Sequence, residues 1–173
     1  CQLESIISGD SEHHEIATNT KSRREQPSAI HKGVELLARR EHSVHELRTK
    51  LNAKDYAETE VESALEYLVS EGLVSDDRFC EAYIRMRTLK GYGPAKIKQE
   101  LSQRGVKSEL IEAHLDFNHE LWQSRAVDTY QRKFGEEPPQ DYKEWSRRAR
   151  FLQSRGYSSA IIREICPDIH YSD

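Results

Sequence analysis

Cysteine, proline and glycine are all scarce in this chain: its 173 residues include 3, 5 and 8 of them, respectively. Cys1, Cys80 and Cys166 are widely spaced and form no CxxC pair, which argues against a disulfide framework and against a zinc site. We therefore expect inert thiols in a reducing cytosol. The shortage of proline and glycine leaves helices with few interruptions.

Long apolar runs are missing as well. No stretch of about 18 apolar residues occurs, so we expect no membrane span. There is no charged–apolar–small leader either, so we expect no secretory signal and a cytoplasmic protein. The composition is 36% hydrophobic and 32% charged. That is less apolar than a single compact core usually requires, and it favours an elongated array with much surface per residue.

Motifs of the common enzyme classes are also absent. The sequence has no GxxxxGK[ST], no GxGxxG after a strand, no HExxH and no GxSxG. His42 and His45 stand three residues apart without a ligand set around them, so we interpret them as a surface pair rather than a metal site. His13 and His14 are interpreted as a solvated pair, because they lie in a segment that we expect to be a flexible tail. We expect no catalytic residue, metal or cofactor, and an enzyme is the least favoured interpretation.

The chain begins with a polar segment, and the helical pattern starts after it. Residues 1–27 are rich in Ser, Thr, Glu and His and show little apolar periodicity after Ile7. We predict that they form a flexible tail that ends at Pro27.

Three amphipathic helices are expected between residues 28 and 74. Ser43 begins the second of them as part of a capping box, because Glu46 follows three positions later. Gly72 supplies the left-handed residue that ends the third. The expected buried faces are Ile30, Val34 and Leu37, then Val44, Leu47 and Leu51, then Val61, Leu65 and Leu68.

The same order recurs twice further along the chain. Helix start signals occur at Ser75, at Pro94 after the break Gly91-Tyr-Gly, and at Asp141 with Glu144. The helix that follows Ser75 is expected to bury Phe79, Tyr83 and Met86. The last round begins near Leu121.

These rounds form an internal repeat. Leu51–Tyr56 aligns with Leu101–Val106 and Leu152–Tyr157 at offsets of 50 and 51 residues. The turn Leu-x3-Gly-apolar occurs twice in full, and in the first copy Asp55 replaces the glycine, since Asp tolerates the left-handed conformation. The apolar positions that follow agree without a gap at Val61, Ile111 and Ile162, and at Leu65, Leu115 and Cys166.

We therefore predict an all-α fold. Three tandem three-helix repeats, spanning residues 28–74, 75–118 and 119–173, should form an elongated, curved array. Such an array buries a small core in each repeat and presents a long concave face to a large partner. We expect it to be a monomer.

Charge is distributed unevenly along the chain, whose formal net charge is −4. Residues 78–108 carry 8 basic and 2 acidic side chains, a net charge of +6, whereas residues 28–77 carry −5 and residues 109–173 carry −3. A second basic cluster within the last segment consists of Arg147, Arg148, Arg150 and Arg155.

Basic side chains at helical spacing could follow phosphates or meet an acidic protein surface. The alternative is a solvated face with local pairs such as Lys96–Glu100. Tyr92 could stack on a base or pack on a neighbouring helix, and packing is favoured. The predicted contact residues are Arg78, Arg85, Arg87, Lys90, Tyr92, Lys96, Lys98, Arg104, Lys107, Arg147, Arg148 and Arg150.

The middle repeat also resembles a known family. Ser75-Asp-Asp-Arg-Phe79, Ala82-Tyr83, Arg87, Gly91-Tyr-Gly-Pro94, Ile97, Glu100-Leu101 and Arg104-Gly105-Val106 are similar to the signature of the RecX family. The resemblance covers residues 28 to about 166, although the outer repeats resemble the family mainly in pattern. Residues before Pro27 lie outside it.

The resemblance implies a regulator of the bacterial RecA recombinase, acting in DNA repair and the SOS response. Family members bind the RecA nucleoprotein filament in its helical groove and restrain strand exchange, ATP hydrolysis and coprotease activity, and some also bind DNA. The net acidity of this chain favours a protein or mixed protein–DNA surface over tight binding to free single- or double-stranded DNA. The alternatives are a helix-turn-helix-like DNA-binding protein and a helical scaffold for another protein.

Overall fold

The computed structural model describes residues 26–167, which are helical with no strand among them. The predicted all-α fold is thus confirmed, whereas most of the predicted tail at 1–27, with His13 and His14, lies outside the described residues. The helices are α1 (Ala29–Leu37), α2 (Val44–Asn52), α3 (Glu58–Ser70), α4 (Asp76–Leu89), α5 (Pro94–Gln103), α6 (Ser108–His114), α7 (His119–Phe134), α8 (Tyr142–Ser154) and α9 (Ser159–Ile165).

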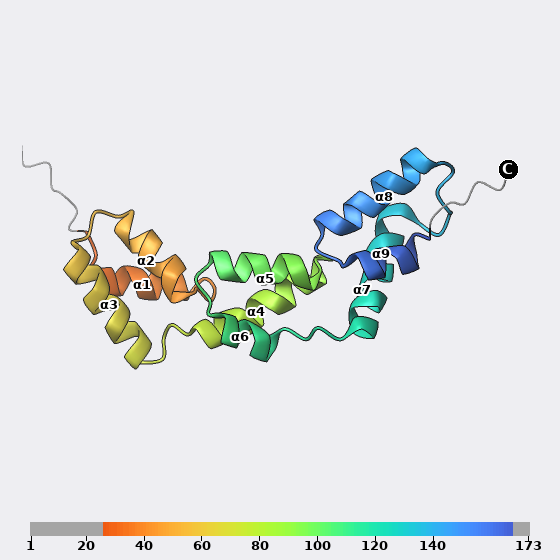
Figure 1. The fold of residues 1–173 in the computed structure, drawn as a ribbon. Coiled ribbons are helices and arrows are strands. Elements are labelled where there is room, and N and C mark those ends of the chain that lie inside the picture. Colours follow the sequence, from red (N-terminus) through yellow and green to blue (C-terminus); the bar gives the residue numbers. More distant parts are fainter. Residues whose placement is uncertain (1–25, 168–173) are drawn as a thin grey trace, which may run out of the picture.

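The helices form three consecutive modules: module 1 (α1–α3), module 2 (α4–α6) and module 3 (α7–α9). Extensive helix–helix contacts lie within each module, as between α1 and α3, α4 and α6, and α7 and α9. The modules follow one another in a bent row (Figure 1), and α2, α5 and α8 lie along the inner side of the bend. The predicted elongated array is therefore confirmed.

The predicted helix starts are confirmed by their side-chain hydrogen bonds. The backbone N–H groups of Glu46, Arg78 and Glu144 donate to Ser43 (3.0 Å), Ser75 (3.2 Å) and Asp141 (2.7 Å), respectively. Each bond satisfies one of the free donors at a helix N-terminus.

The repeated turn is confirmed in all three copies. Asp55, Gly105 and Gly156 have φ values of 62°, 76° and 95°. Asp55 is the one non-glycine residue with positive φ in the described part of the chain, as the alignment of the three turns predicts. The equivalent apolar positions are all buried: Val61, Ile111, Ile162, Leu65, Leu115 and Cys166.

Buried side chains gather in two clusters. Module 1 has its own core around Leu47, Leu51 and Leu68. Modules 2 and 3 share one continuous core, which extends from Phe79 in α4 to Cys166 after α9. The contact between modules 2 and 3 is therefore partly apolar, whereas module 1 meets module 2 through polar groups.

Two predicted buried faces are wrong in part. In α1, Ile30 and Val34 are 37% and 43% exposed, while Ala29 and Gly33 face the core. A Cβ at Gly33 would lie 2.6 Å from Leu68 Cδ1, so the small residue lets α3 approach the backbone of α1. In α4, Met86 is 39% exposed and Cys80 takes a core position instead.

Neighbouring modules meet at a joint that is built the same way twice. The first residue before α2, Ser43, donates from its hydroxyl to the carbonyl of Arg104 in the α5–α6 turn (2.7 Å). One module further on, the equivalent residue before α5, Gly93, donates its N–H to the carbonyl of Arg155 in the α8–α9 turn (2.6 Å). The turn of each later module thus sits on the N-terminus of the second helix of the module before it.

The glycines of these turns allow the close approach. A Cβ at Gly105 would lie 2.6 Å from His45 Cβ, and one at Gly156 would lie 2.5 Å from the backbone nitrogen of Lys96. The same residue type therefore serves both the left-handed turn and the joint.

Membrane spans were not predicted from the sequence, and within residues 26–167 no helix has the length and apolar character that crossing a membrane requires.

Candidate functional site

The predicted contact residues fall into three groups in the structure: side chains held inside the molecule, side chains paired at the module surface, and cations without an ionic partner. Only the last group can meet a macromolecule without first losing an ionic contact, whereas the second group must exchange one carboxylate for another partner.

Arg87 belongs to the first group because it pairs with Glu100. Its guanidinium donates to Glu100 Oε1 at 2.6 Å, and the Tyr83 hydroxyl donates to Glu100 Oε2. Burial alone would raise the pKa of Glu100, but hydrogen bonds from Arg87 and Tyr83 outweigh burial and hold that pKa below its ordinary value. We therefore assign Arg87 to the internal packing of module 2.

The ring of Tyr92 also contacts side chains of its own molecule. The guanidinium carbons of Arg87 and Arg155 lie 3.6 Å and 4.6 Å from the centre of its ring. Cation–π contacts of this kind bind the ring to both modules. Packing, the favoured interpretation of Tyr92, is confirmed.

Arg148 corrects the predicted second cluster. It is only 4% exposed, donates to Glu144 (2.6 Å), to the Tyr130 hydroxyl (2.8 Å) and to the Glu137 carbonyl (2.8 Å), and fastens α8 to the end of α7. A guanidinium with these partners is a structural group, not a contact for another molecule.

Arg78, Arg85 and Arg104 form the second group. Arg78 pairs with Glu41 (3.0 Å) and Arg104 pairs with Glu46 (3.3 Å), and both pairs bridge modules 1 and 2. Arg85 pairs with Glu81 one turn away on α4 (3.1 Å). Exposed pairs contribute little to stability, so Arg78 and Arg85 can exchange partners at low cost, whereas the pair of Arg104 is partly buried.

The third group comprises the cations that lack a carboxylate within 4 Å among the described residues: Lys90, Lys96, Lys98, Lys107 and Arg150. Arg147 resembles them, since its contact with Glu144 is long, at 3.8 Å. These side chains lie on α4, α5, α8 and the start of α6. They give modules 2 and 3 a surface that can attract anions.

Three further cations join this surface, namely Arg132, Lys133 and Arg155. Arg132 and Lys133 lie on α7 and were not among the predicted residues. All three line one cleft together with Lys90. Their separation along the chain hid the arrangement, because nothing in a sequence shows that positions 90, 132 and 155 meet.

Two observations bear on the cysteines and on metal binding among the described residues. Cys80 and Cys166 are buried, and burial raises the pKa of the Cys80 thiol to about 11. No group of three or more metal-binding side chains occurs between residues 26 and 167.

The predicted surface pair of histidines is wrong in one member. His42 is 1% exposed, with Nδ1 3.0 Å from the Arg40 carbonyl and Nε2 2.8 Å from Lys50 Nζ. Burial holds the pKa of His42 below its ordinary value, so the ring fits as a neutral hydrogen-bonding group.

Together, the fold and this surface define a helical repeat protein with three three-helix domains and a basic side. Three family models match the chain in order: "RecX, first three-helix domain" at residues 29–68, "RecX, second three-helix domain" at 75–115 and "RecX, third three-helix domain" at 120–166. The chain belongs to the RecX family.

Curated relatives agree with this assignment. "Regulatory protein RecX" of Pseudomonas syringae pv. tomato is 42% identical over 137 residues, which cover 79% of this chain and 88% of the relative. "Regulatory protein RecX" of Pseudomonas tolaasii is 42% identical over 132 residues, or 76% of this chain and 85% of the relative.

Solved structures share the fold. The crystal structure of RecX from Lactobacillus salivarius superimposes with a TM-score of 0.60 at 20% identity, covering 79% of this chain and 91% of that one. A second crystal structure, of regulatory protein RecX, gives a TM-score of 0.63 at 21% identity over 79% and 69% of the two chains.

Proposed function

We propose that this chain acts in the cytoplasm as a monomeric, non-enzymatic regulator that binds the RecA nucleoprotein filament and mostly inhibits its recombinase, ATPase and coprotease activities. DNA repair and the SOS response are the processes in which it would act. The support for a regulatory role is the name of its relatives, which are regulatory proteins RecX.

The observation that carries this proposal is the serial joint. Modules joined in the same way at Ser43 and at Gly93 extend the chain as a bent row with one continuous inner side (Figure 1). A filament presents repeated subunits along a groove, and an elongated array can contact several of them at once. An array lying in that groove would occupy the path of a second DNA strand.

Electrostatics would guide this contact. The unpaired cations of module 2, Lys98 and Lys107, are exposed and lie on its surface, and Arg147 and Arg150 extend the positive charge to module 3. Charges of this kind raise the association rate and fix the orientation of the partner more than they raise affinity.

The test is ATP hydrolysis by RecA on single-stranded DNA, titrated with this protein. Wild type should reduce the rate. Lys98→Glu combined with Lys107→Glu should abolish most of the reduction while the far-UV circular dichroism stays unchanged, because both side chains are exposed. Arg39→Glu combined with Arg163→Glu carries the same change in charge on modules 1 and 3 and should still inhibit.

Two outcomes would count against the proposal. Unchanged ATP hydrolysis at saturating wild-type protein would remove RecA as the partner. Equal loss in both double variants would show that total charge, and not the surface of module 2, produces the effect.

A further inference from the structure

The joint between modules 2 and 3 contains a cleft of about 180 Å³. Its walls come from the end of α4, from α7, and from α8 with the turn that follows it. The lining residues are Lys90, Gly91, Thr129, Arg132, Lys133, Phe151 and Arg155. Four of these seven are cations and none is acidic.

None of the four cations forms an ion pair with a carboxylate among residues 26–167. Arg155 lies over the rings of Tyr92 and Phe151, at 4.6 Å and 5.0 Å, and reaches the Lys90 carbonyl at 3.5 Å. Arg132 donates from Nε to the Asp128 carbonyl at 3.3 Å. The rings hold the Arg155 guanidinium in place, and most of its donors remain available to a ligand.

The first joint of the same chain provides an internal comparison. There, Glu46 in the first turn of α2 accepts from Arg40 (3.0 Å) and pairs with Arg104 (3.3 Å). One carboxylate thus contacts both arginines of the joint between modules 1 and 2 and offsets part of their charge.

The second joint reverses this charge. Ser43 and Gly93 occupy the same place in the two joints, so Lys96 takes the position of Glu46. Lys90 and Arg155 then correspond to Arg40 and Arg104. The carboxylate of the first joint is replaced by a fifth cation, and the positive charge of the second joint has no carboxylate partner among the described residues.

The neighbouring pocket at the first joint differs accordingly. Its volume is about 170 Å³, and its lining contains Phe79, Ala82, Tyr83 and Met86 besides Arg40 and Glu41. Most of these lining side chains are apolar, and the one arginine among them is paired with Glu46, so this pocket does not attract an anion. The two joints therefore share a backbone arrangement but differ in the ligand that they can accept.

We propose that the cleft between modules 2 and 3 binds backbone phosphates of nucleic acid. Arginine offers a planar fork to the non-bridging oxygens of a phosphodiester, and the lysines add charge around it. Phe151 is the one large apolar side chain among the lining residues, so the cleft lacks the cluster of anchors that a protein partner requires. This inference deepens the proposed function, because the filament proposed as partner contains DNA.

Fluorescence anisotropy of a fluorescein-labelled oligothymidylate, titrated with the full chain, tests the site. Arg132→Gln combined with Lys133→Gln should weaken binding about tenfold and lower the slope of log K against log salt by about 1.4, the value for two lost phosphate contacts on a single strand. Lys96→Glu, which copies the charge of the first joint, should weaken binding to a similar degree. Circular dichroism verifies that each variant is folded.

Arg39→Gln combined with Arg163→Gln is the matched control, since it removes two charges from residues that do not line the cleft and should change the affinity less than twofold. Equal weakening in the control pair would overturn the proposal, as would an unchanged affinity of the cleft variants or no binding by wild type. If the cleft variants lost binding to DNA-free RecA but kept the oligonucleotide, the cleft would bind an acidic protein surface instead.

The test also separates this site from the proposed function. If wild type left RecA ATP hydrolysis unchanged while the cleft variants still weakened oligonucleotide binding, the filament would be the wrong partner and the phosphate site would stand.

Discussion

Whether a basic side chain is free to bind a partner cannot be read from its charge alone. Arg87 and Arg148 were predicted to contact a partner, yet each is held by a carboxylate and a tyrosine hydroxyl or ring of its own module. Lys98 and Lys107, from the same prediction, are exposed and have no carboxylate partner among the described residues. All four have the same charge, and the difference depends on which neighbours the fold supplies.

Glu100→Gln tests the internal network of module 2. We expect it to lower the free energy of unfolding by about 3 kcal/mol at neutral pH, because it leaves the Arg87 guanidinium half-buried without its counter-charge. The folded-state pKa of Glu100 lies below its ordinary value, so its contribution to stability is present at neutral pH and is lost as the pH falls through the folded-state pKa. Urea unfolding at a series of pH values should show the gap between wild type and variant narrowing toward acid.

Glu81→Gln is the control for this measurement. It removes the partner of Arg85 from a pair in which both side chains are more than half exposed, and its effect should stay below about 0.5 kcal/mol. A constant gap at all pH values would mean that Glu100 acts through packing and not through its charge.

Among the helices, the N-termini were predictable, whereas the buried faces of α1 and α4 were predicted only in part. Each capping side chain accepts a hydrogen bond from the N–H group three residues later, so a short stretch of sequence is enough to identify it. This holds for Ser43, Ser75 and Asp141. The face of α1 depends on how closely α3 approaches, and Gly33 permits a contact that apolar spacing does not describe. The spacing of apolar residues predicts that a helix has an apolar face. Which residues are buried also depends on how closely the neighbouring helix approaches.

Ser43→Ala tests whether a helix cap also serves the joint. Ser43 is fully buried, accepts from Glu46 N–H and donates to the Arg104 carbonyl, so its loss should cost about 2 kcal/mol. Ser158→Ala removes a cap from α9 whose hydroxyl makes no hydrogen bond to another module among the described residues, and it should cost about 1 kcal/mol. Thermal unfolding of both variants measures the difference, and equal costs would show that the joint does not need the hydroxyl.

Across the whole array, the 50-residue period of the sequence predicts the order of the modules. It does not predict how neighbouring modules are joined. Its bonds run from N–H and hydroxyl groups to the carbonyls of Arg104 and Arg155, and a carbonyl is present at every position of a chain. The basic cleft was hidden for the same reason, since Arg132 and Lys133 reach it only after modules 2 and 3 have joined.

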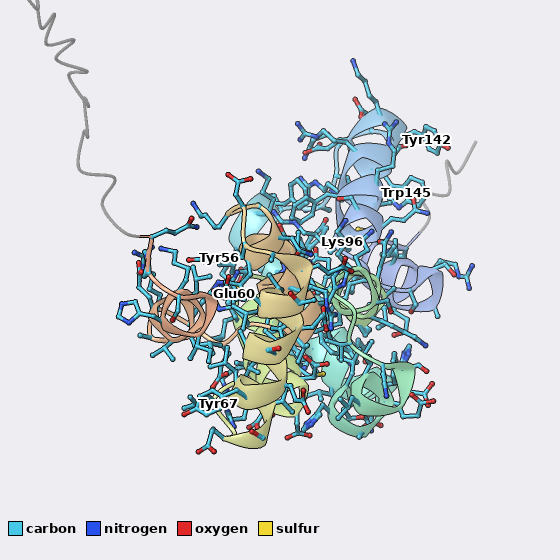
Figure 2. All side chains as sticks on the ribbon, turned by 90° about the vertical axis from the view of Figure 1, so that its left-hand side faces the viewer. Tyr56, Glu60, Tyr67, Lys96, Tyr142 and Trp145 are labelled. Atoms are coloured by element: carbon cyan, nitrogen blue, oxygen red, sulfur yellow. The ribbon has the colours of Figure 1, made fainter. Side chains whose placement is uncertain are left out.

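Gly156→Ala should separate the unfolding of module 3 from the rest. A methyl group there meets the backbone of Lys96 at 2.5 Å, which should cost about 2 kcal/mol beyond the strain of the left-handed turn. Both tryptophans, Trp122 and Trp145, lie in module 3, and Trp145 stands beside Tyr142 on one side of α8 (Figure 2). Tryptophan fluorescence and circular dichroism should coincide for wild type and diverge for the variant.

Gly72→Ala distinguishes the joint from the turn. Gly72 also has positive φ, at 67°, but no atom lies within 4 Å of a Cβ placed there. It should cost about 1 kcal/mol and leave the two signals coincident. Divergence in Gly72→Ala as well would attribute the effect to backbone strain alone.

Gln26 contacts the turn of module 1 that corresponds to the joint turns of modules 2 and 3. The carbonyl of Lys54 corresponds to those of Arg104 and Arg155, which accept from the preceding module, and here the Gln26 side-chain amide donates to it at 2.5 Å. A side chain of module 1 therefore occupies the acceptor that joins neighbouring modules elsewhere in the array. Another module could bind there through the same kind of joint only by displacing this amide.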